Sequence, residues 1–266
     1  MGGMVETKVI FDAADDYERV MGAWSRAAGE QFLDWLAPAP GLQWLDVGCG
    51  TGAFSEIVLK RCSPASIAGV DPAPAQIDYA RGRMPQAEWR VGDAMAIPFP
   101  EQQFDIVASA LVLNFVPDLG KALAEMRRVL RPGGLVAGYL WQRGASSDFS
   151  PHVPMEGALQ SIGVEVLRPP SKPESSPEGA RSALERAGFA DVSVTAVVAT
   201  RTFPNFEDYW SVQTLLISPV GKSVAALSSD RREALRDVVH AMLKPADDGA
   251  ITYSAQAVAF QALRPH

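Results

Sequence analysis

The chain has 266 residues, of which 47% are hydrophobic and 21% charged, a composition typical of a globular protein with a sizeable core. Its 24 basic and 31 acidic residues give a net charge of −7, which excludes the global positive field that favours nucleic acid binding. The two cysteines, Cys49 and Cys62, predict neither a disulfide framework nor a zinc site. No apolar run is long enough to span a membrane and no signal peptide is apparent, so we expect a cytoplasmic protein.

Strand and helix patterns alternate along residues 42–141. Five apolar runs predict strands: LQWLDVG, SIAGVD, AEWRVGD, FDIVASALVL and LVAGYLW. Helical spacing fills the gaps in FSEIVLKRC, APAQIDYARGRM and the stripe that runs from Leu119 to Leu130. Asp118 is the predicted N-cap of this last helix, and the RPGG sequence at 131–134 is predicted to end it. The alternation predicts an α/β fold, with a mostly parallel sheet between two layers of helices.

Three segments depart from this alternation of strand and helix patterns. Residues 1–40 contain the amphipathic stretch YERVMGAWSRAAGEQFLDWL and are predicted to form an N-terminal helical lid on the main domain, residues 41–266. Residues 143–180 are rich in Ser, Pro and Gly, so we expect a loop or mobile lid that buries little apolar surface. Residues 203–248 read as two helices between two strand patterns, DVSVTAVVATRTF and AITYSAQAVAFQAL, and are predicted to be a second lid insertion.

A glycine-rich turn, LDVGCGTG, follows the first predicted strand. Gly48, Gly50 and Gly52 have the spacing G-x-G-x-G, whereas the dinucleotide fingerprint is G-x-G-x-x-G. Asp46 precedes the turn, where a carboxylate suits an ammonium group better than a pyrophosphate. The N–H groups of the turn, near a helix N-terminus, are expected to suit a carboxylate. A ligand with both groups is an amino acid, which places a nicotinamide dehydrogenase last among the alternatives.

Two further acidic residues end neighbouring strands. Asp71 follows the second strand and can accept hydrogen bonds from both hydroxyls of a ribose. Asp93 follows the third strand, where it can accept an adenine amino group, although it can also be a plain turn residue. Because the carboxyl ends of parallel strands meet at one edge, the three carboxylates together outline S-adenosylmethionine.

Four blocks carry a family resemblance. LDVGCGTGAFS, GVDPAPAQIDYAR, RVGDAMAIPFPEQQFDIVASALVLNFV and ALAEMRRVLRPGGLVAG, within residues 42–141, resemble in order and spacing the class I S-adenosylmethionine-dependent methyltransferases. The resemblance is to the small-molecule branch that includes ubiquinone and menaquinone C-methyltransferases. It implies a Rossmann-like seven-stranded sheet with helices on both faces, an antiparallel last strand and helical lid insertions.

The resemblance also implies the residues that contact the cofactor. The set is Tyr17, Arg26, Asp46, Gly48, Cys49, Gly50, Gly52, Asp71, Pro72, Gln76, Asp93, Ala94 and Ala110. Within it, the glycine turn holds the methionine end, Asp71 the ribose, and Asp93 with the Ala94 N–H the adenine. Tyr17 and Arg26 resemble an N-terminal Tyr/Arg segment that closes over the cofactor, although Tyr17 and Trp24 can also be core aromatics.

The sequence does not assign the catalytic residues. The family often has a His pair after the fourth strand, where this chain has Asn114 and Phe115. His152, Glu156, Tyr209 and Tyr17 are candidate general bases, and no metal cluster is evident. We therefore expect a methyltransferase that uses S-adenosyl-L-methionine and a small, partly apolar acceptor, with no nucleic acid or membrane partner. The alternatives are a protein or RNA methyltransferase and a non-catalytic S-adenosylmethionine-binding protein.

Overall fold

The computed structural model describes residues 16, 18–142, 152–166 and 172–266. Seven strands form one sheet in the order β3-β2-β1-β4-β5-β7-β6. Only β7 runs antiparallel to its neighbours, β5 and β6, which confirms the predicted sheet. The strands are β1 (Gln43–Val47), β2 (Ser66–Asp71), β3 (Glu88–Val91), β4 (Phe104–Ala110), β5 (Leu130–Trp141), β6 (Ala190–Phe203) and β7 (Ile251–Leu263).

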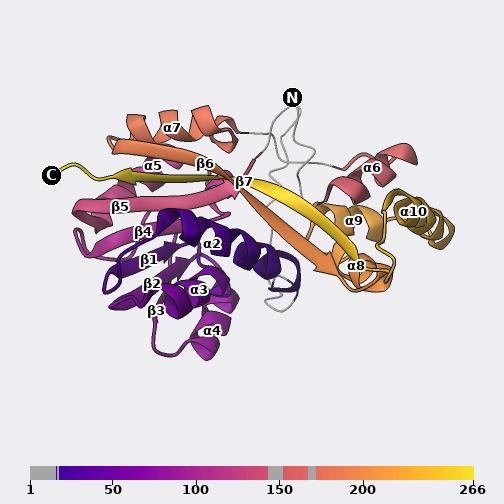
Figure 1. Cartoon of the computed structure of the whole chain (residues 1–266), viewed down its shortest axis with the longest axis horizontal. Coiled ribbons are helices and arrows are strands. Elements are labelled where there is room, and N and C mark those ends of the chain that lie inside the picture. Colours follow the sequence, from indigo (N-terminus) through magenta and orange to yellow (C-terminus); the bar gives the residue numbers. More distant parts are fainter. Residues whose placement is uncertain (1–15, 17, 143–151, 167–171) are drawn as a thin grey trace, which may run out of the picture.

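Helices cover both faces of the sheet (Figure 1). On one face, α2 and α3 pack on alternate strand residues such as Trp44 and Ile106. On the other face, α5 and α7 pack on the residues between these, such as Leu45 and Val107. The helices are η1 (Glu18–Gly22), α2 (Ala23–Leu36), α3 (Ala53–Cys62), α4 (Pro74–Arg83), η2 (Leu113–Phe115), α5 (Leu119–Val129), α6 (Val153–Ser161), η3 (Pro173–Ser175), α7 (Pro177–Arg186), α8 (Phe206–Gln213), α9 (Pro219–Ala225) and α10 (Ser229–Met242).

The last two strands extend beyond the rest of the sheet. Trp141, the last residue of β5, pairs with Ala257, whereas β7 begins at Ile251 and pairs there with Phe203 of β6. The strand ends 198–203 and 251–256 therefore project past β5 at the carboxyl edge of the parallel strands. They carry α6, α8, α9 and α10 (Figure 1), and we call these helices and strand ends the cap. The cap has its own apolar core.

The structure corrects two sequence predictions. Residues 153–161, predicted as loop, form α6, and its Met155 and Leu159 are fully buried in the cap. Pro154 stands in the first turn of α6, where proline is compatible with a helix. Residues 203–248, predicted as two helices, contain three, because α9 was not predicted. Helix α5 ends at Val129, just before the RPGG sequence, as predicted, and the RPGG residues themselves belong to β5.

Other predictions on the main domain are confirmed. Helix α5 buries its apolar stripe, and the Asp118 carboxylate accepts a hydrogen bond from the Lys121 N–H at 2.9 Å as the N-cap. Helix α2, within the predicted N-terminal lid, packs on the sheet through the buried residues Trp24 and Phe32. Tyr17 and residues 143–151 and 167–171 lie outside the described residues. The division into a lid at 1–40 and a domain at 41–266 stays a prediction.

The burial of α6 predicts that Leu159→Ala lowers the free energy of unfolding by about 2–5 kcal/mol, because a buried leucine leaves a cavity. Gln160→Ala, at the next and exposed position, should change it by less than about 0.5 kcal/mol. Urea denaturation followed by circular dichroism measures both. An unchanged stability for Leu159→Ala would show that α6 does not pack in the cap.

Candidate functional site

The turn between β1 and α3 lies where the order of the strands reverses, with β2 on one side of β1 and β4 on the other. Ligands of open α/β sheets bind at such a switch point. The backbone φ angle is +76° at Gly48, +53° at Gly50 and +79° at Gly52, a left-handed conformation that favours glycine. A Cβ atom on Gly48 would also stand 2.4 Å from the side chain of Val112. The backbone conformation of the turn therefore requires glycine at these positions, whether or not a ligand is bound.

Most N–H groups of this turn are already used within the chain. The N–H groups of Gly48 and Cys49 donate to the Val70 carbonyl, that of Gly50 donates to Asp71, and that of Gly52 donates to the Cys49 carbonyl. The expectation that these N–H groups bind a ligand carboxylate is therefore wrong for these four residues. The hydrogen bonds of Gly48, Cys49 and Gly50 instead fix the turn to the end of β2, and that of Gly52 closes the turn on itself.

Asp46 is a buried carboxylate with one open oxygen. Its side chain is 2% exposed, and its Oδ2 accepts a hydrogen bond from the Ser55 hydroxyl at 2.6 Å. Its Oδ1 has no hydrogen-bond partner within the described part of the chain. Burial, with a smaller contribution from the charge of Asp71, raises the pKa of Asp46 to about 7. An unpartnered carboxylate oxygen in this position suits a cationic group, because a nearby positive charge favours the ionised form.

Asp71 joins the end of β2 to the glycine turn. One oxygen accepts from the Gly50 N–H at 3.0 Å and the other from the Ala73 N–H at 2.9 Å. Burial raises the pKa of Asp71, although these two N–H groups act in the opposite direction. Beside it, Pro72 is exposed and Gln76 is buried on α4. The glycine turn and Asp71 therefore lie next to each other, as predicted, and the hydrogen bond from the Gly50 N–H to Asp71 joins them.

The remaining predicted site residues surround this centre. Asp93 lies exposed beyond β3 and accepts a hydrogen bond from the Met95 N–H at 2.7 Å, and Ala94 is partly buried next to it. Ala110 is buried at the carboxyl end of β4. The Cys49 thiol is buried, and burial raises its pKa well above the usual value, which fits a space-filling role better than a nucleophilic one.

A charged cluster beside the turn was not predicted. The Glu18 carboxylate, in η1, accepts hydrogen bonds from the Thr51 hydroxyl at 2.6 Å and from Arg83 at 3.1 Å, and it forms an ion pair with Arg26. Burial raises the pKa of Glu18, but these hydrogen bonds outweigh it and hold the pKa below its usual value. Arg26, predicted at the cofactor, thus lies at the mouth of the turn. Arg83 also pairs with Glu56.

The candidate bases that the structure describes lie in or next to the cap. His152 Nδ1 is 2.9 Å from the Gln213 side-chain oxygen, and the Gln213 amide donates to the Tyr253 hydroxyl at 2.7 Å. Glu156 is buried on α6. Tyr209 is fully buried, and its hydroxyl has no hydrogen-bond partner in the described residues. Asn114 lies beside the end of β5, where its side chain donates to the Trp141 carbonyl at 3.4 Å.

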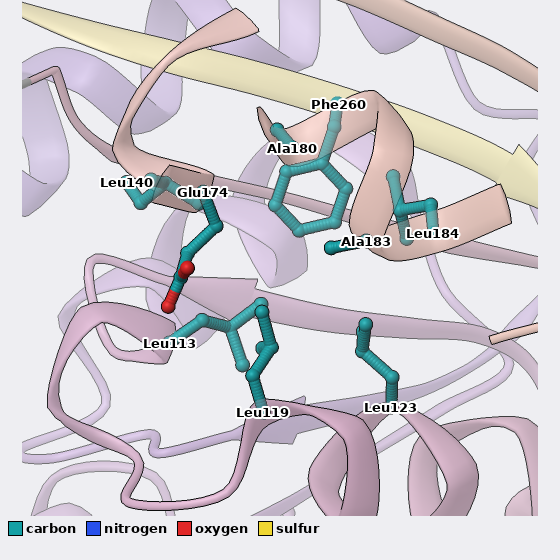
Figure 2. Close-up of a pocket in the computed structure, with 9 residues that line it drawn as sticks. All are labelled: Leu113, Leu119, Leu123, Leu140, Glu174, Ala180, Ala183, Leu184 and Phe260. Atoms are coloured by element: carbon teal, nitrogen blue, oxygen red, sulfur yellow. The ribbon is translucent and has the colours of Figure 1, made fainter. Parts of the chain in front are cut away.

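A small pocket lies elsewhere, between the α5 and α7 helices. Figure 2 shows Glu174 among apolar side chains at this pocket, which contains no residue of the glycine turn or of the cap. The lining residues are Leu113, Leu119, Leu123, Leu140, Glu174, Ala180, Ala183, Leu184 and Phe260. The pocket is therefore separate from the switch point.

Within the described residues, no three or more His, Cys, Asp or Glu side chains gather as a metal site. None of the helices that the structure describes is both long and apolar enough to cross a membrane.

Residues 45–138 match a protein family described as "Methyltransferase domain". The chain is 38% identical over 129 residues to a malonyl-[acyl-carrier protein] O-methyltransferase of Serratia marcescens, which covers 46% of this chain and 50% of that protein. It is 38% identical over 119 residues to a ubiquinone/menaquinone biosynthesis C-methyltransferase of Cereibacter sphaeroides, over 42% of this chain and 48% of that protein. The chain thus spans about half the length of these curated relatives.

Solved structures share the fold. A Haemonchus contortus phosphoethanolamine N-methyltransferase 2, solved with S-adenosyl-L-methionine, has a TM-score of 0.59 at 18% identity, over 98% of this chain and 59% of that one. A [4+2]-cyclase has a TM-score of 0.54 at 18% identity, over 89% of this chain and 79% of that one. The two proteins are named for different reactions, so the shared fold does not by itself determine the chemistry.

The raised pKa of Asp46 predicts a pH-dependent stability. Because the folded-state pKa of about 7 exceeds the ordinary value of 3.8, the folded chain binds the proton more tightly than the unfolded chain. The contribution of Asp46 to the free energy of unfolding therefore falls as the pH rises from about 4 to about 7. Asp46→Asn should remove this fall, so the variant gains stability relative to the parent between pH 5 and pH 8.

Urea denaturation at pH 5, pH 6.5 and pH 8 measures the difference. Asp247→Asn, in an exposed loop before β7, is the control and should run parallel to the parent. A constant difference between Asp46→Asn and the parent across this range would show that the Asp46 carboxyl group does not titrate there.

Proposed function

We propose that this chain is a class I S-adenosylmethionine-dependent methyltransferase, which transfers a methyl group from S-adenosyl-L-methionine to a small, partly apolar organic acceptor. The observation that carries the proposal is the buried Asp46 carboxylate with its open oxygen beside the glycine turn. This arrangement suits a ligand whose end carries an ammonium group. A dinucleotide pyrophosphate would meet a negative charge at the same place.

The residues present fit the cofactor. Asp46 and the turn from Gly48 to Gly52 would hold the amino-acid end, and the Asp71 carboxylate would accept the ribose hydroxyls with its remaining lone pairs. Adenine would lie against Asp93, the Ala94 N–H and Ala110, and Pro72, Gln76 and Cys49 would line the adenosine side. When bound, the cofactor supplies a methyl group on a sulfonium centre. The chain itself has to position both reactants and exclude water, since alignment supplies much of the rate in such a displacement.

The cap supports a small acceptor. It stands beyond the carboxyl edge of the sheet, and aromatic side chains join the two parts: the rings of Trp24 and Tyr253 lie 5.3 Å apart, and those of Trp24 and Trp141 lie 5.8 Å apart. We propose that residues 203–248 and α6 form one wall of the acceptor site.

The net charge of −7 supports a small organic acceptor over nucleic acid. The relatives are named for quinone and malonyl-[acyl-carrier protein] methylation, which supports a partly apolar acceptor. We also propose that the protein works in the cytoplasm.

Cofactor choice tests the proposal directly. Isothermal titration calorimetry should show binding of S-adenosylmethionine and S-adenosylhomocysteine and no binding of NAD. Transfer of a labelled methyl group to a panel of quinones, phenols and carboxylic acids then separates an enzyme from a non-catalytic binder. Tight NAD binding without a response to S-adenosylhomocysteine would overturn the proposal.

The position of Asp71 predicts a large effect of its removal. Asp71→Ala should weaken S-adenosylhomocysteine binding by about 2–5 kcal/mol, the range for truncating one side of a buried, charged hydrogen-bonding contact. Asp78→Ala on α4, whose carboxylate is exposed and pairs with Arg81, is the matched control and should leave the affinity nearly unchanged. Calorimetry measures both variants. Parent-like affinity in Asp71→Ala would show that the ribose is held elsewhere.

A further inference from the structure

Side chains at the mouth of the turn can bind the carboxylate of a bound amino-acid end. Four of the five N–H groups from Gly48 to Gly52, those of Gly48, Cys49, Gly50 and Gly52, donate within the chain. Side-chain donors therefore supplement the backbone there. The Thr51 hydroxyl belongs to the turn itself, and two guanidinium groups, those of Arg26 and Arg83, stand next to it.

These three donors already bind a carboxylate of the chain. Glu18 Oε2 accepts from the Thr51 hydroxyl at 2.6 Å, and Glu18 Oε1 is shared by Arg26 and by Arg83, the latter at 3.1 Å. The Glu18 side chain is 15% exposed, so the surrounding water screens these charges less than it screens a surface ion pair. Guanidinium groups match the geometry of a carboxylate well, and a hydroxyl donor completes such a site.

A second carboxylate cannot join Glu18 on the same donors at low cost. Two like charges a few ångströms apart repel, more strongly where they are partly buried. Because the Glu18 side chain is mostly buried, its carboxylate repels any ligand carboxylate that approaches the turn. A ligand without a carboxylate meets no such competition.

We propose that Glu18 is an internal competitor that occupies Thr51 and Arg26 in the ligand-free protein and yields them to the carboxylate of the bound cofactor. This inference rests on the proposed function. Arg83 binds Glu18 through Nη1 and Glu56 through Nη2, so its contact with Glu18 does not depend on Thr51 or Arg26 and can persist after the exchange. Glu18 is thus a specificity-determining residue, because it makes the binding of an adenosyl ligand depend on the amino-acid end.

The exchange also reaches the cap through η1. Arg201 of β6 donates to the main-chain carbonyls of Arg19 at 2.8 Å and Val20 at 3.1 Å, and the Val20 side chain is part of the apolar core of the cap. The short π-helix η1, a conformation found often at functional sites, therefore touches both the glycine turn and the cap. When Thr51 and Arg26 release Glu18, the contacts of η1 change, and η1 packs against the cap through Val20.

Glu18→Gln tests the proposal, because glutamine keeps the size and the acceptor oxygen but loses the charge. Calorimetry should show S-adenosylhomocysteine binding about three- to tenfold tighter than in the parent. This factor is expected if the state in which Thr51 and Arg26 are free of Glu18 is populated at roughly 10–30% in the parent and becomes dominant in the variant. The affinity for 5′-methylthioadenosine, which has no amino-acid end, should stay within about twofold. Glu18→Ala removes the competitor altogether and should show the same pattern.

Glu56→Gln is the matched control, because Glu56 binds Arg83 and Lys60, whereas Thr51 and Arg26 bind Glu18. The charge of Glu56 acts on Arg26 without an ion pair between them. It should not tighten the binding of S-adenosylhomocysteine. Weaker or unchanged S-adenosylhomocysteine binding in both Glu18 variants would overturn the proposal, as would an equal gain for 5′-methylthioadenosine. A parent protein that binds neither ligand would overturn the proposed function, and with it this inference.

Discussion

The left-handed path of the turn between β1 and α3 is the constraint around which the rest of the site is arranged. With positive φ angles at Gly48, Gly50 and Gly52, the chain reverses within a few residues and starts α3 over the carboxyl edge of the sheet. The same path brings the Gly50 N–H to the Asp71 carboxylate. It also leaves Asp46 buried beneath the turn with one oxygen open. A side chain on these glycines would strain the turn and move both carboxylates relative to each other.

In the proposed function, the cofactor lies at the sheet and the acceptor lies at the cap. The glycine turn and the strand ends of the parallel sheet form the proposed cofactor side, and the β6–β7 hairpin carries the cap beyond them. The cap has its own apolar core, so it can vary in shape without disturbing the sheet. Contact between the two parts runs through the aromatic rings around Trp24 and Tyr253 and through η1. Such a division lets one scaffold serve different acceptors, in line with the different reactions found on this fold.

The sequence predicted what depends on local patterns. The apolar stripe and the Asp118 N-cap predicted α5, and the strand ends predicted that Asp46 and Asp71 approach the turn. It missed α6, because the apolar residues of this helix lie next to Pro154 and Gly157 in a segment whose Ser, Pro and Gly content is typical of loops. It also missed the Glu18 cluster, because Thr51 and Arg83 reach Glu18 only through the tertiary fold. The N–H groups of Gly48, Cys49 and Gly50 were misjudged for the same reason, since their acceptors come from β2.

The most direct test of this account is a crystal structure of the chain with S-adenosylhomocysteine. We expect the amino-acid end of the ligand at the turn, with its ammonium group beside Asp46, and the ribose hydroxyls within hydrogen-bonding distance of Asp71. The adenine should lie toward Asp93. Density for the ligand in the apolar pocket beside Glu174, or at the turn with the ribose away from Asp71, would contradict the account.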